Sequence, residues 1–150
     1  WSSDVCSSDL LLLAVLGGIF ARAGVGDLLS GFLASGLPLD NRAVALVVYA
    51  AAMALLTMVM GNAFASFPVI AIGIGLPVLV ARHGADPAPL AALGMLAGYC
   101  GTLLTPMAAN FNIVPVALLG LRDQYSVIRA QALTALPLFA CNLVFLFLFT

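Results

Sequence analysis

From residue 11 onwards, charged side chains occur at only four places, and long uncharged stretches lie between them. The four clusters are Arg22 with Asp27, Asp40 with Arg42, Arg82 to Asp86, and Arg122 with Asp123 and Arg129. A charged side chain at the centre of a bilayer costs about 2.5–3.5 kcal/mol on insertion scales, so we expect all four clusters at or near membrane surfaces. The sequence therefore predicts an integral membrane protein.

The composition excludes a water-soluble domain. Hydrophobic residues make up 64% of the 150 residues and charged residues only 7%, whereas soluble proteins carry about 25% charged residues. A chain so poor in charge has too few polar groups to cover a surface that faces water. The net charge of −1 gives no basis for binding nucleic acid, so the expected partner is the lipid bilayer.

The first ten residues, WSSDVCSSDL, differ abruptly from the leucine-rich sequence that follows them. They resemble the translation of a common short-read sequencing adapter. We therefore interpret residues 1–10 as a library artefact and exclude them from the fold. On this interpretation residues 11–150 are a transmembrane domain whose natural N-terminus is missing.

The apolar blocks between the charges differ in length. Residues 11–21 are too short to cross a bilayer, while residues 130–150 fit one span of roughly 20 residues. Residues 43–81 and 87–121 are each too long for one span, yet neither contains a charged loop that would divide it into two. An uncharged break is therefore expected inside each of these two blocks.

Both breaks combine glycine, proline and small polar residues. The first reads MGNAFASFP over residues 60–68, and the second reads GYCGTLLTPMAANFN over residues 98–112. Pro106 has no N–H and would leave the carbonyl of Thr102 without its helical partner. Irregular backbone at membrane depth is tolerated only where it is buried in protein or lines a cavity, and transporters use such breaks to hold ions and carboxylates.

The predicted fold is therefore an all-α, polytopic transmembrane helical bundle with broken helices or re-entrant hairpins. We expect a helix over residues 43–59, and segments 69–81 and 113–121 that are short for a full crossing. Tight uncharged hairpins between two full spans would produce a similar sequence, so this alternative stays open.

Two local patterns predict a helix start and a close helix contact. Asp40 or Asn41 is suited to cap the helix that begins near Ala43, because short polar side chains accept hydrogen bonds from the first turn. Gly94 and Gly98 form a GxxxG pair inside an apolar run. Such pairs let two helix backbones approach closely, so packing is the expected role of these glycines.

The segments at residues 60–77 and 94–118 resemble the DUF979 family of bacterial integral membrane proteins. The resemblance covers most of residues 11–150 and implies that they are the C-terminal half of a longer protein. It also implies a distant relation to the ion-transporter superfamily of secondary carriers. Genes of the family lie beside a companion membrane family and pyroglutamate-processing enzymes, which suggests 5-oxoproline or a similar small organic acid as substrate.

Six uncharged polar residues of the two breaks are predicted to form a substrate-binding site near the membrane midplane, with half-helix ends supplying part of the ligand field. They are Asn62, Ser66, Thr102, Thr105, Asn110 and Asn112. The two residues of the first break contribute only if that break meets the second. The alternative for Asn110 and Asn112 is hydrogen bonding between helices, worth about 0.6 kcal/mol on average. The alternative for Thr102 and Thr105 is a structural role, and Thr102 could bond back to its own helix.

The second break carries two asparagines that bear on the shape of this site. In a regular helix Asn110 and Asn112 would point about 200° apart. If the local backbone is extended, both could turn toward one cavity. The site prediction therefore includes both amides.

The expected function is transport across the bacterial inner membrane by a multi-pass permease. The two broken blocks contain no Asp, Glu or His, which argues against a proton relay and favours Na⁺ as the coupling ion, held by carbonyls and hydroxyls. No other cofactor is expected. A companion membrane protein or a second copy of the chain is an expected partner, and the alternative function is a non-transporting subunit that scaffolds such a partner.

Neither catalysis nor a bound metal is expected from the remaining candidates. Gly24–Asp27 matches the short signature of intramembrane aspartyl proteases, but that chemistry needs two facing carboxylates. Cys100 and Cys141 have no second ligand at metal-binding spacing, and His83 lies in a short polar stretch.

Overall fold

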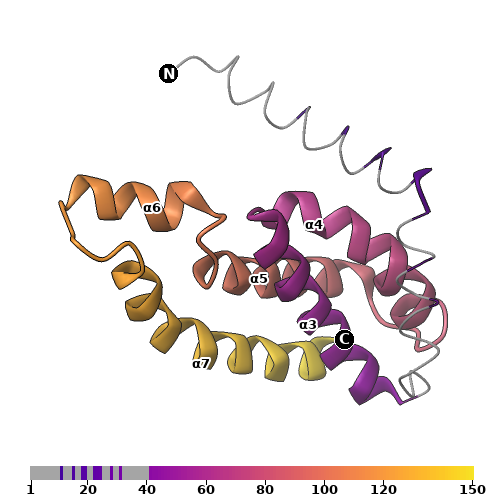
Figure 1. The fold of residues 1–150 in the computed structure, drawn as a ribbon. Coiled ribbons are helices and arrows are strands. Elements are labelled where there is room, and N and C mark those ends of the chain that lie inside the picture. Colours follow the sequence, from indigo (N-terminus) through magenta and orange to yellow (C-terminus); the bar gives the residue numbers. More distant parts are fainter. Residues whose placement is uncertain are drawn as a thin grey trace.

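The computed structural model describes residues 11, 15, 18, 19, 22–24, 28, 31 and 41–150. The interpretations of residues 1–10, Asp27 and Asp40 lie outside these described residues. From residue 41 onwards every regular element is helical (Figure 1), so the predicted all-α class is confirmed. The elements are α3 (Arg42–Met60), α4 (Ala63–Ile70), the π-helix η1 (Ala71–Val80), α5 (Pro87–Leu103), α6 (Ala109–Leu118) and α7 (Ser126–Phe149).

Three helices of the described part are long and apolar enough to cross a membrane: α3, the continuous Ala63–Val80 helix, and α7. The 17 residues of α5 are also apolar. Charges lie at or near helix ends: Arg42 begins α3, the segment Arg82 to Asp86 links η1 to α5, and Arg129 lies in the first turn of α7. This protein is therefore a membrane protein, and the charged residues named here lie at or near helix ends.

Helices α3 and α5 run side by side in the same direction. Early in both helices the Tyr49 hydroxyl donates to the Leu90 carbonyl at 3.3 Å, and at their far ends the Thr105 hydroxyl donates to the Met58 carbonyl at 2.8 Å. The order of these contacts along the two segments fixes the parallel arrangement. The buried core lies between α3, η1 and α5.

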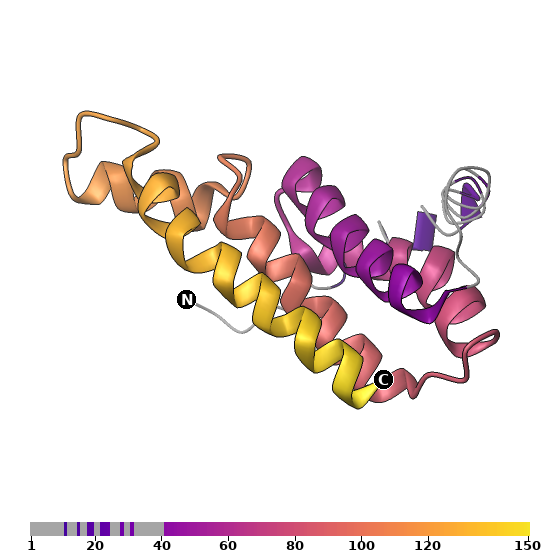
Figure 2. The same cartoon turned by 90° about the horizontal axis from the view of Figure 1, so that it is seen from below.

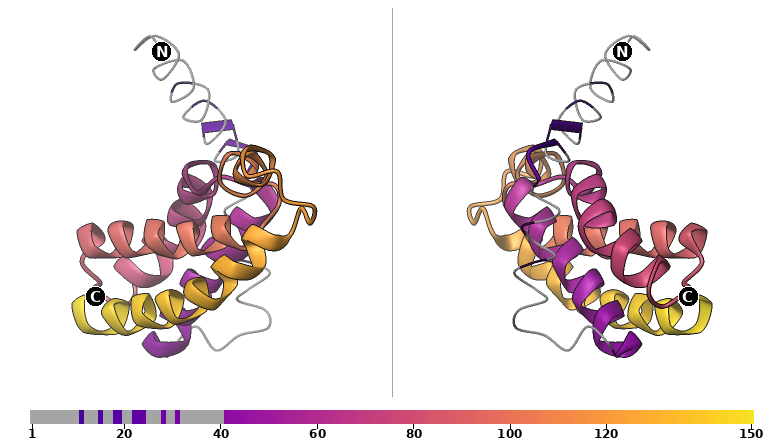
Figure 3. Two further views of the ribbon diagram at one scale, coloured as in Figure 1. Left: turned by 90° about the vertical axis from the view of Figure 1, so that its left-hand side faces the viewer. Right: turned by 90° about the vertical axis from the view of Figure 1, so that its right-hand side faces the viewer.

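The other two long helices return in the opposite direction. The Ala63–Val80 helix packs back against α3, and α7 lies antiparallel along α5 (Figure 2). The Asn142 amide of α7 donates to the Leu93 carbonyl of α5 at 2.9 Å. Helix α6 leads away from the place where α4 begins and is seen nearly end-on beside it in Figure 3.

Glycines bring α5 into close contact with α3. A Cβ atom at Gly94 would collide with the Tyr49 ring, and one at Gly101 would collide with the backbone carbonyl of Ala54. Gly98 is buried between them, on the same side of the helix. The predicted GxxxG pair therefore packs helices, and Gly101 extends the same surface by one turn.

The first break is much shorter than the predicted span of residues 60–68. Only Gly61 and Asn62 are non-helical, because Gly61 is the C-cap of α3 and Asn62 is the N-cap of α4. Gly61 has a φ of 73° and donates its N–H to the Thr57 carbonyl, whereas the Asn62 side chain accepts from the N–H of Phe64 at 2.9 Å. The break is a tight turn between two helices.

Helix therefore resumes well before residue 69, where a short segment was expected to begin. Pro68 lies inside α4, and α4 continues without interruption into η1. Together they form an 18-residue apolar helix, so the prediction that this segment is short for a crossing is wrong. The alternative of a tight uncharged hairpin between two full-length helices describes the first break.

The second break is confined to residues 104–108. The ten residues of α6 that follow are short for a crossing, as predicted for residues 113–121. The N–H groups of Phe111 and Asn112 both donate to the Ala108 carbonyl at 3.0 Å, which closes the first helical turn. The backbone of residues 110–112 is thus helical, so the extended conformation that would turn both asparagines toward one cavity is not formed.

The expected helix cap is confirmed at Asn41. Its side-chain oxygen accepts from the N–H of Ala43 at 3.0 Å, and α3 begins at Arg42. Asp86 caps α5 in the same way, accepting from the N–H of Ala88 at 3.0 Å. Both caps satisfy backbone donors that have no partner inside the helix.

Candidate functional site

The two breaks are in direct contact at one end of the bundle. The Thr105 hydroxyl of the second break donates to the carbonyl of Met58, close to the end of α3. On the other side of the contact, a Cβ atom on Gly61 would lie 2.7 Å from the Met107 carbonyl oxygen, so only glycine fits there. The first break therefore meets the second, which is the condition under which Asn62 and Ser66 were expected to contribute to a shared site.

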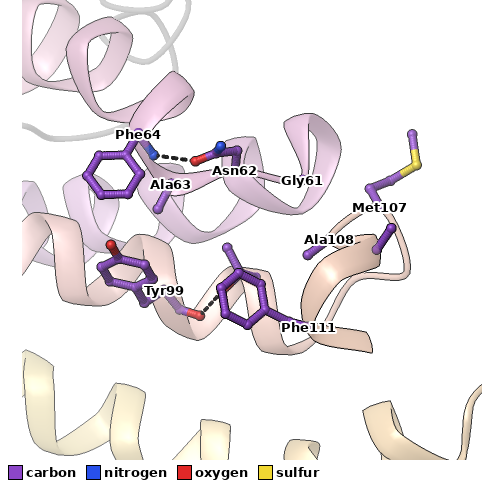
Figure 4. A pocket seen from close by; sticks show the side chains of 10 residues that line it. Gly61, Asn62, Ala63, Phe64, Tyr99, Met107, Ala108 and Phe111 are labelled. Carbon is purple, nitrogen blue, oxygen red and sulfur yellow. Dashed lines mark hydrogen bonds between the residues drawn. The ribbon is translucent and has the colours of Figure 1, made fainter. Parts of the chain in front are cut away.

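An open pocket of about 280 Å³ lies between the two breaks (Figure 4). Its walls come from the turn after α3, the last part of α5 and the start of α6. The lining residues are Gly61, Asn62, Ala63, Phe64, Tyr99, Thr102, Met107, Ala108, Ala109 and Phe111.

Two helix N-termini border this pocket. The lining includes the first turn of α4, from Ala63, and the first turn of α6, from Ala109. A helix N-terminus carries the equivalent of about half a positive charge and presents N–H groups that have no helical partner. No charged side chain lines the pocket, so no carboxylate in its walls offsets the partial positive charge of the two helix N-termini.

Aromatic side chains form one wall of the pocket. The rings of Phe64 and Tyr99 meet edge to face with their centroids 6.0 Å apart. Figure 4 shows Phe111 reaching back from α6 toward Tyr99. The pocket thus combines flat apolar walls with two helix starts.

Two of the six predicted residues line this pocket, and both also make local hydrogen bonds. The side-chain oxygen of Asn62 caps α4, and its amide nitrogen takes no part in this cap. The Thr102 hydroxyl donates to the Tyr99 carbonyl at 2.6 Å, the common habit of threonine in a helix.

Ser66 lies away from the pocket, in a buried pair with Thr57. The two hydroxyl oxygens are 2.5 Å apart, both side chains are fully buried, and the Ser66 hydroxyl also lies 3.1 Å from the Ala63 carbonyl. The pair joins α3 to α4 just below the turn. Thr57 was missed by the sequence analysis, although a hydroxyl one turn before a helix break is a usable signal.

Asn112 closes the second break from the inside. Its amide nitrogen donates to the carbonyls of Thr102 and Thr105 at 2.9 and 2.5 Å. The Thr102 carbonyl is the one that Pro106 was predicted to free. Asn112 is fully buried, and among the residues that the structure describes its side-chain oxygen has no hydrogen-bond partner.

The structure thus sorts the six predicted residues into three places. Asn62 and Thr102 line the pocket, Ser66 joins α3 to α4, and Thr105 and Asn112 hold the second break together. Asn110 lies in α6, and its side chain is not among the described ones. The aromatic residues and the helix starts of the pocket were not among the predicted residues.

The pocket lies at one end of α3. It follows the last residue of α3, whose 19 residues extend over about 28 Å from the Arg42 end. That length is close to the hydrocarbon thickness of about 30 Å. A bilayer crossed by the whole of α3 would therefore have the pocket near one of its surfaces.

The fold and the two meeting breaks define a helical membrane protein with interrupted apolar helices. The family model described as protein of unknown function (DUF979) matches residues 4–150, so the chain belongs to this family and the predicted resemblance is confirmed. No curated protein and no solved structure gives a significant match to the chain.

Proposed function

We propose that the protein is a multi-pass permease of the bacterial inner membrane that transports a small organic acid such as 5-oxoproline. The observation that carries the proposal is the open pocket where the two breaks meet, bordered by two helix N-termini. Half-helix N-termini that point at anionic groups are a recurring feature of secondary transporters. In this proposal the carboxylate of the substrate binds at the starts of α4 and α6.

The lining chemistry supports a small, weakly polar anion. The pocket offers one amide, from Asn62, and one hydroxyl, from Thr102, beside the aromatic wall. A lactam ring with one carboxylate has flat apolar faces and a few hydrogen-bonding atoms, which match this combination. A strongly charged phosphate ester would call for arginine or lysine, and neither occurs in the lining.

The proposal predicts that Asn62→Asp strongly lowers uptake without disturbing the fold. Aspartate caps a helix as well as asparagine does, so the bond to the N–H of Phe64 would be kept. The new negative charge would repel an anionic substrate in the pocket. We expect uptake of labelled 5-oxoproline to fall at least about tenfold, which corresponds to about 1.4 kcal/mol.

The matched control is Asn41→Asp. Asn41 caps α3 with the same side-chain geometry, but it does not line the pocket. Uptake is compared at equal membrane abundance, with the full-length protein and its companion membrane protein expressed together. Equal uptake by the two variants would contradict a substrate site at this pocket. Absence of uptake for a panel of small acids would instead favour the scaffolding subunit.

A further inference from the structure

A second cavity, of about 210 Å³, adjoins the pocket between the breaks. Tyr99, Thr102 and Phe111 line both cavities, so the two share one wall. The other walls of the second cavity come from α5 and from the second half of α7. We call this second cavity the apolar chamber.

Apart from the shared wall, the apolar chamber is lined mainly by large apolar side chains. Helix α5 supplies Leu96 and Leu103, and α7 supplies Leu138 and Phe145. Among the described residues, its lining adds two thiols and one amide but no charged side chain. The chamber therefore suits an apolar group and provides no site for a carboxylate of its own.

The apolar chamber reaches into the interface between α5 and α7. Cys100 and Thr102 lie on its α5 side and are only 2% and 4% exposed. Phe111 of the shared wall is 54% exposed, and exposed side chains change rotamer rapidly. A turn of the Phe111 ring away from Tyr99, toward which it reaches in Figure 4, would join the two cavities.

We infer that the two cavities bind one amphiphilic acid, with its carboxylate at the starts of α4 and α6 and its apolar body in the apolar chamber. The pocket between the breaks has the helix N-termini, and the chamber beside it has the apolar walls. The substrate class is then monocarboxylates whose apolar body is larger than the ring of 5-oxoproline. This inference rests on the proposed function and deepens it by naming the class of acid.

Burial of the apolar body sets the size of the expected effect. Moving a phenyl group from water into an apolar cavity tightens binding by about tenfold or more. Butyrate and 4-phenylbutyrate are matched probes, because they have the same carboxylate and differ by one phenyl group. The alcohol 4-phenylbutan-1-ol has the same apolar body without the charge.

Binding is tested by thermal unfolding of the purified full-length protein in detergent, with increasing concentrations of each probe. A ligand that binds only the folded state raises the unfolding midpoint. We expect 4-phenylbutyrate to act at a concentration about tenfold or more below that of butyrate. Equal potency of the two acids, as expected if a lipid acyl chain or detergent fills the chamber, would overturn the inference. An equal effect of 4-phenylbutan-1-ol would also overturn it.

Leu138→Trp should remove the preference for 4-phenylbutyrate over butyrate. Leu138 lines the apolar chamber but not the pocket between the breaks, so a larger ring there competes only with the phenyl group. Leu133→Trp is the matched control, because Leu133 is on the same helix, is 80% exposed and lines neither cavity. A preference that both variants keep, or that both lose, would contradict binding of the phenyl group in the chamber.

The assay separates this inference from the proposed function, because it measures binding without transport. A phenyl preference that Leu138→Trp removes, together with no uptake of any acid, would keep the binding site and remove the permease. Uptake of 5-oxoproline that depends on Asn62, without a phenyl preference, would do the reverse. If Leu138→Trp does not fold, the comparison of the two acids on the wild type still decides the outcome.

Discussion

Gly101→Leu should prevent the stable packing of α5 against α3. A Cβ atom at Gly101 would overlap the carbonyl oxygen of Ala54, which belongs to the backbone of α3 and cannot rotate away. Overfilling a packed interior usually costs about 1–3 kcal/mol, and here two helices would have to separate. We expect a loss of at least about 3 kcal/mol, measured by denaturant titration in mixed micelles.

The same change at an exposed position of α5 is the control for Gly101→Leu. Ala92 is exposed on this helix, so Ala92→Leu places the same side chain where it faces the surroundings of the chain. Its stability should stay within about 0.5 kcal/mol of the wild type. Equal losses from both variants would show that α3 and α5 do not pack as described.

Asn112→Leu should have the second large effect on stability. Leucine is similar in size but cannot donate, so the carbonyls of Thr102 and Thr105 would lose their partner inside the protein. Each buried polar group left unpaired costs about 1–3 kcal/mol. We expect a loss of about 2–5 kcal/mol in the free energy of unfolding, again measured in mixed micelles.

Asn142→Leu provides the comparison for Asn112→Leu. It removes one hydrogen bond, to the Leu93 carbonyl in the middle of α5, where the regular helical hydrogen bond remains. Such side-chain bonds between membrane helices average about 0.6 kcal/mol. A loss from Asn142→Leu as large as that from Asn112→Leu would contradict the special role of the second break.

Both large effects concern the end of the bundle where the breaks meet. Gly101 sets the distance between α3 and α5 just before their ends, and Asn112 holds the loop that follows α5. The pocket between the breaks depends on both, since its walls are the turn after α3 and the loop before α6. The same contacts that stabilise the bundle thus position the proposed substrate site.

Several features follow from the sequence because they depend on local or bulk properties. The lack of charge determines a membrane environment, since isolated charges are too costly in hydrocarbon. Asn41 is a recognisable cap, and Pro106 identifies a carbonyl that must find another partner. The existence of two uncharged breaks also followed, because each apolar block is too long for one span.

The extent of each break was decided by hydrogen bonds that a single sequence does not display. Pro68 looked like part of the first break, but the Asn62 cap starts a helix before it and the helix continues past it. For residues 110–112 the sequence left helical and extended conformations open, and the Ala108 carbonyl closes a helical turn over them. At the first break the Asn62 cap thus outweighed the nearby Pro68, whereas α6 starts without a side-chain cap.

Tertiary structure alone decided which polar groups of distant segments come into contact. Thr105 and Met58 are far apart in the sequence, so their contact arises only when α3 and α5 lie parallel at the distance set by glycines. The sequence determined that this is a membrane protein, because the free-energy cost of placing a chain in hydrocarbon depends on its charged residues. It also determined that there are two helix breaks, because each of two uncharged blocks is too long for one span. Only packing decided that the breaks meet and enclose a pocket, because that depends on distances between segments far apart in the chain.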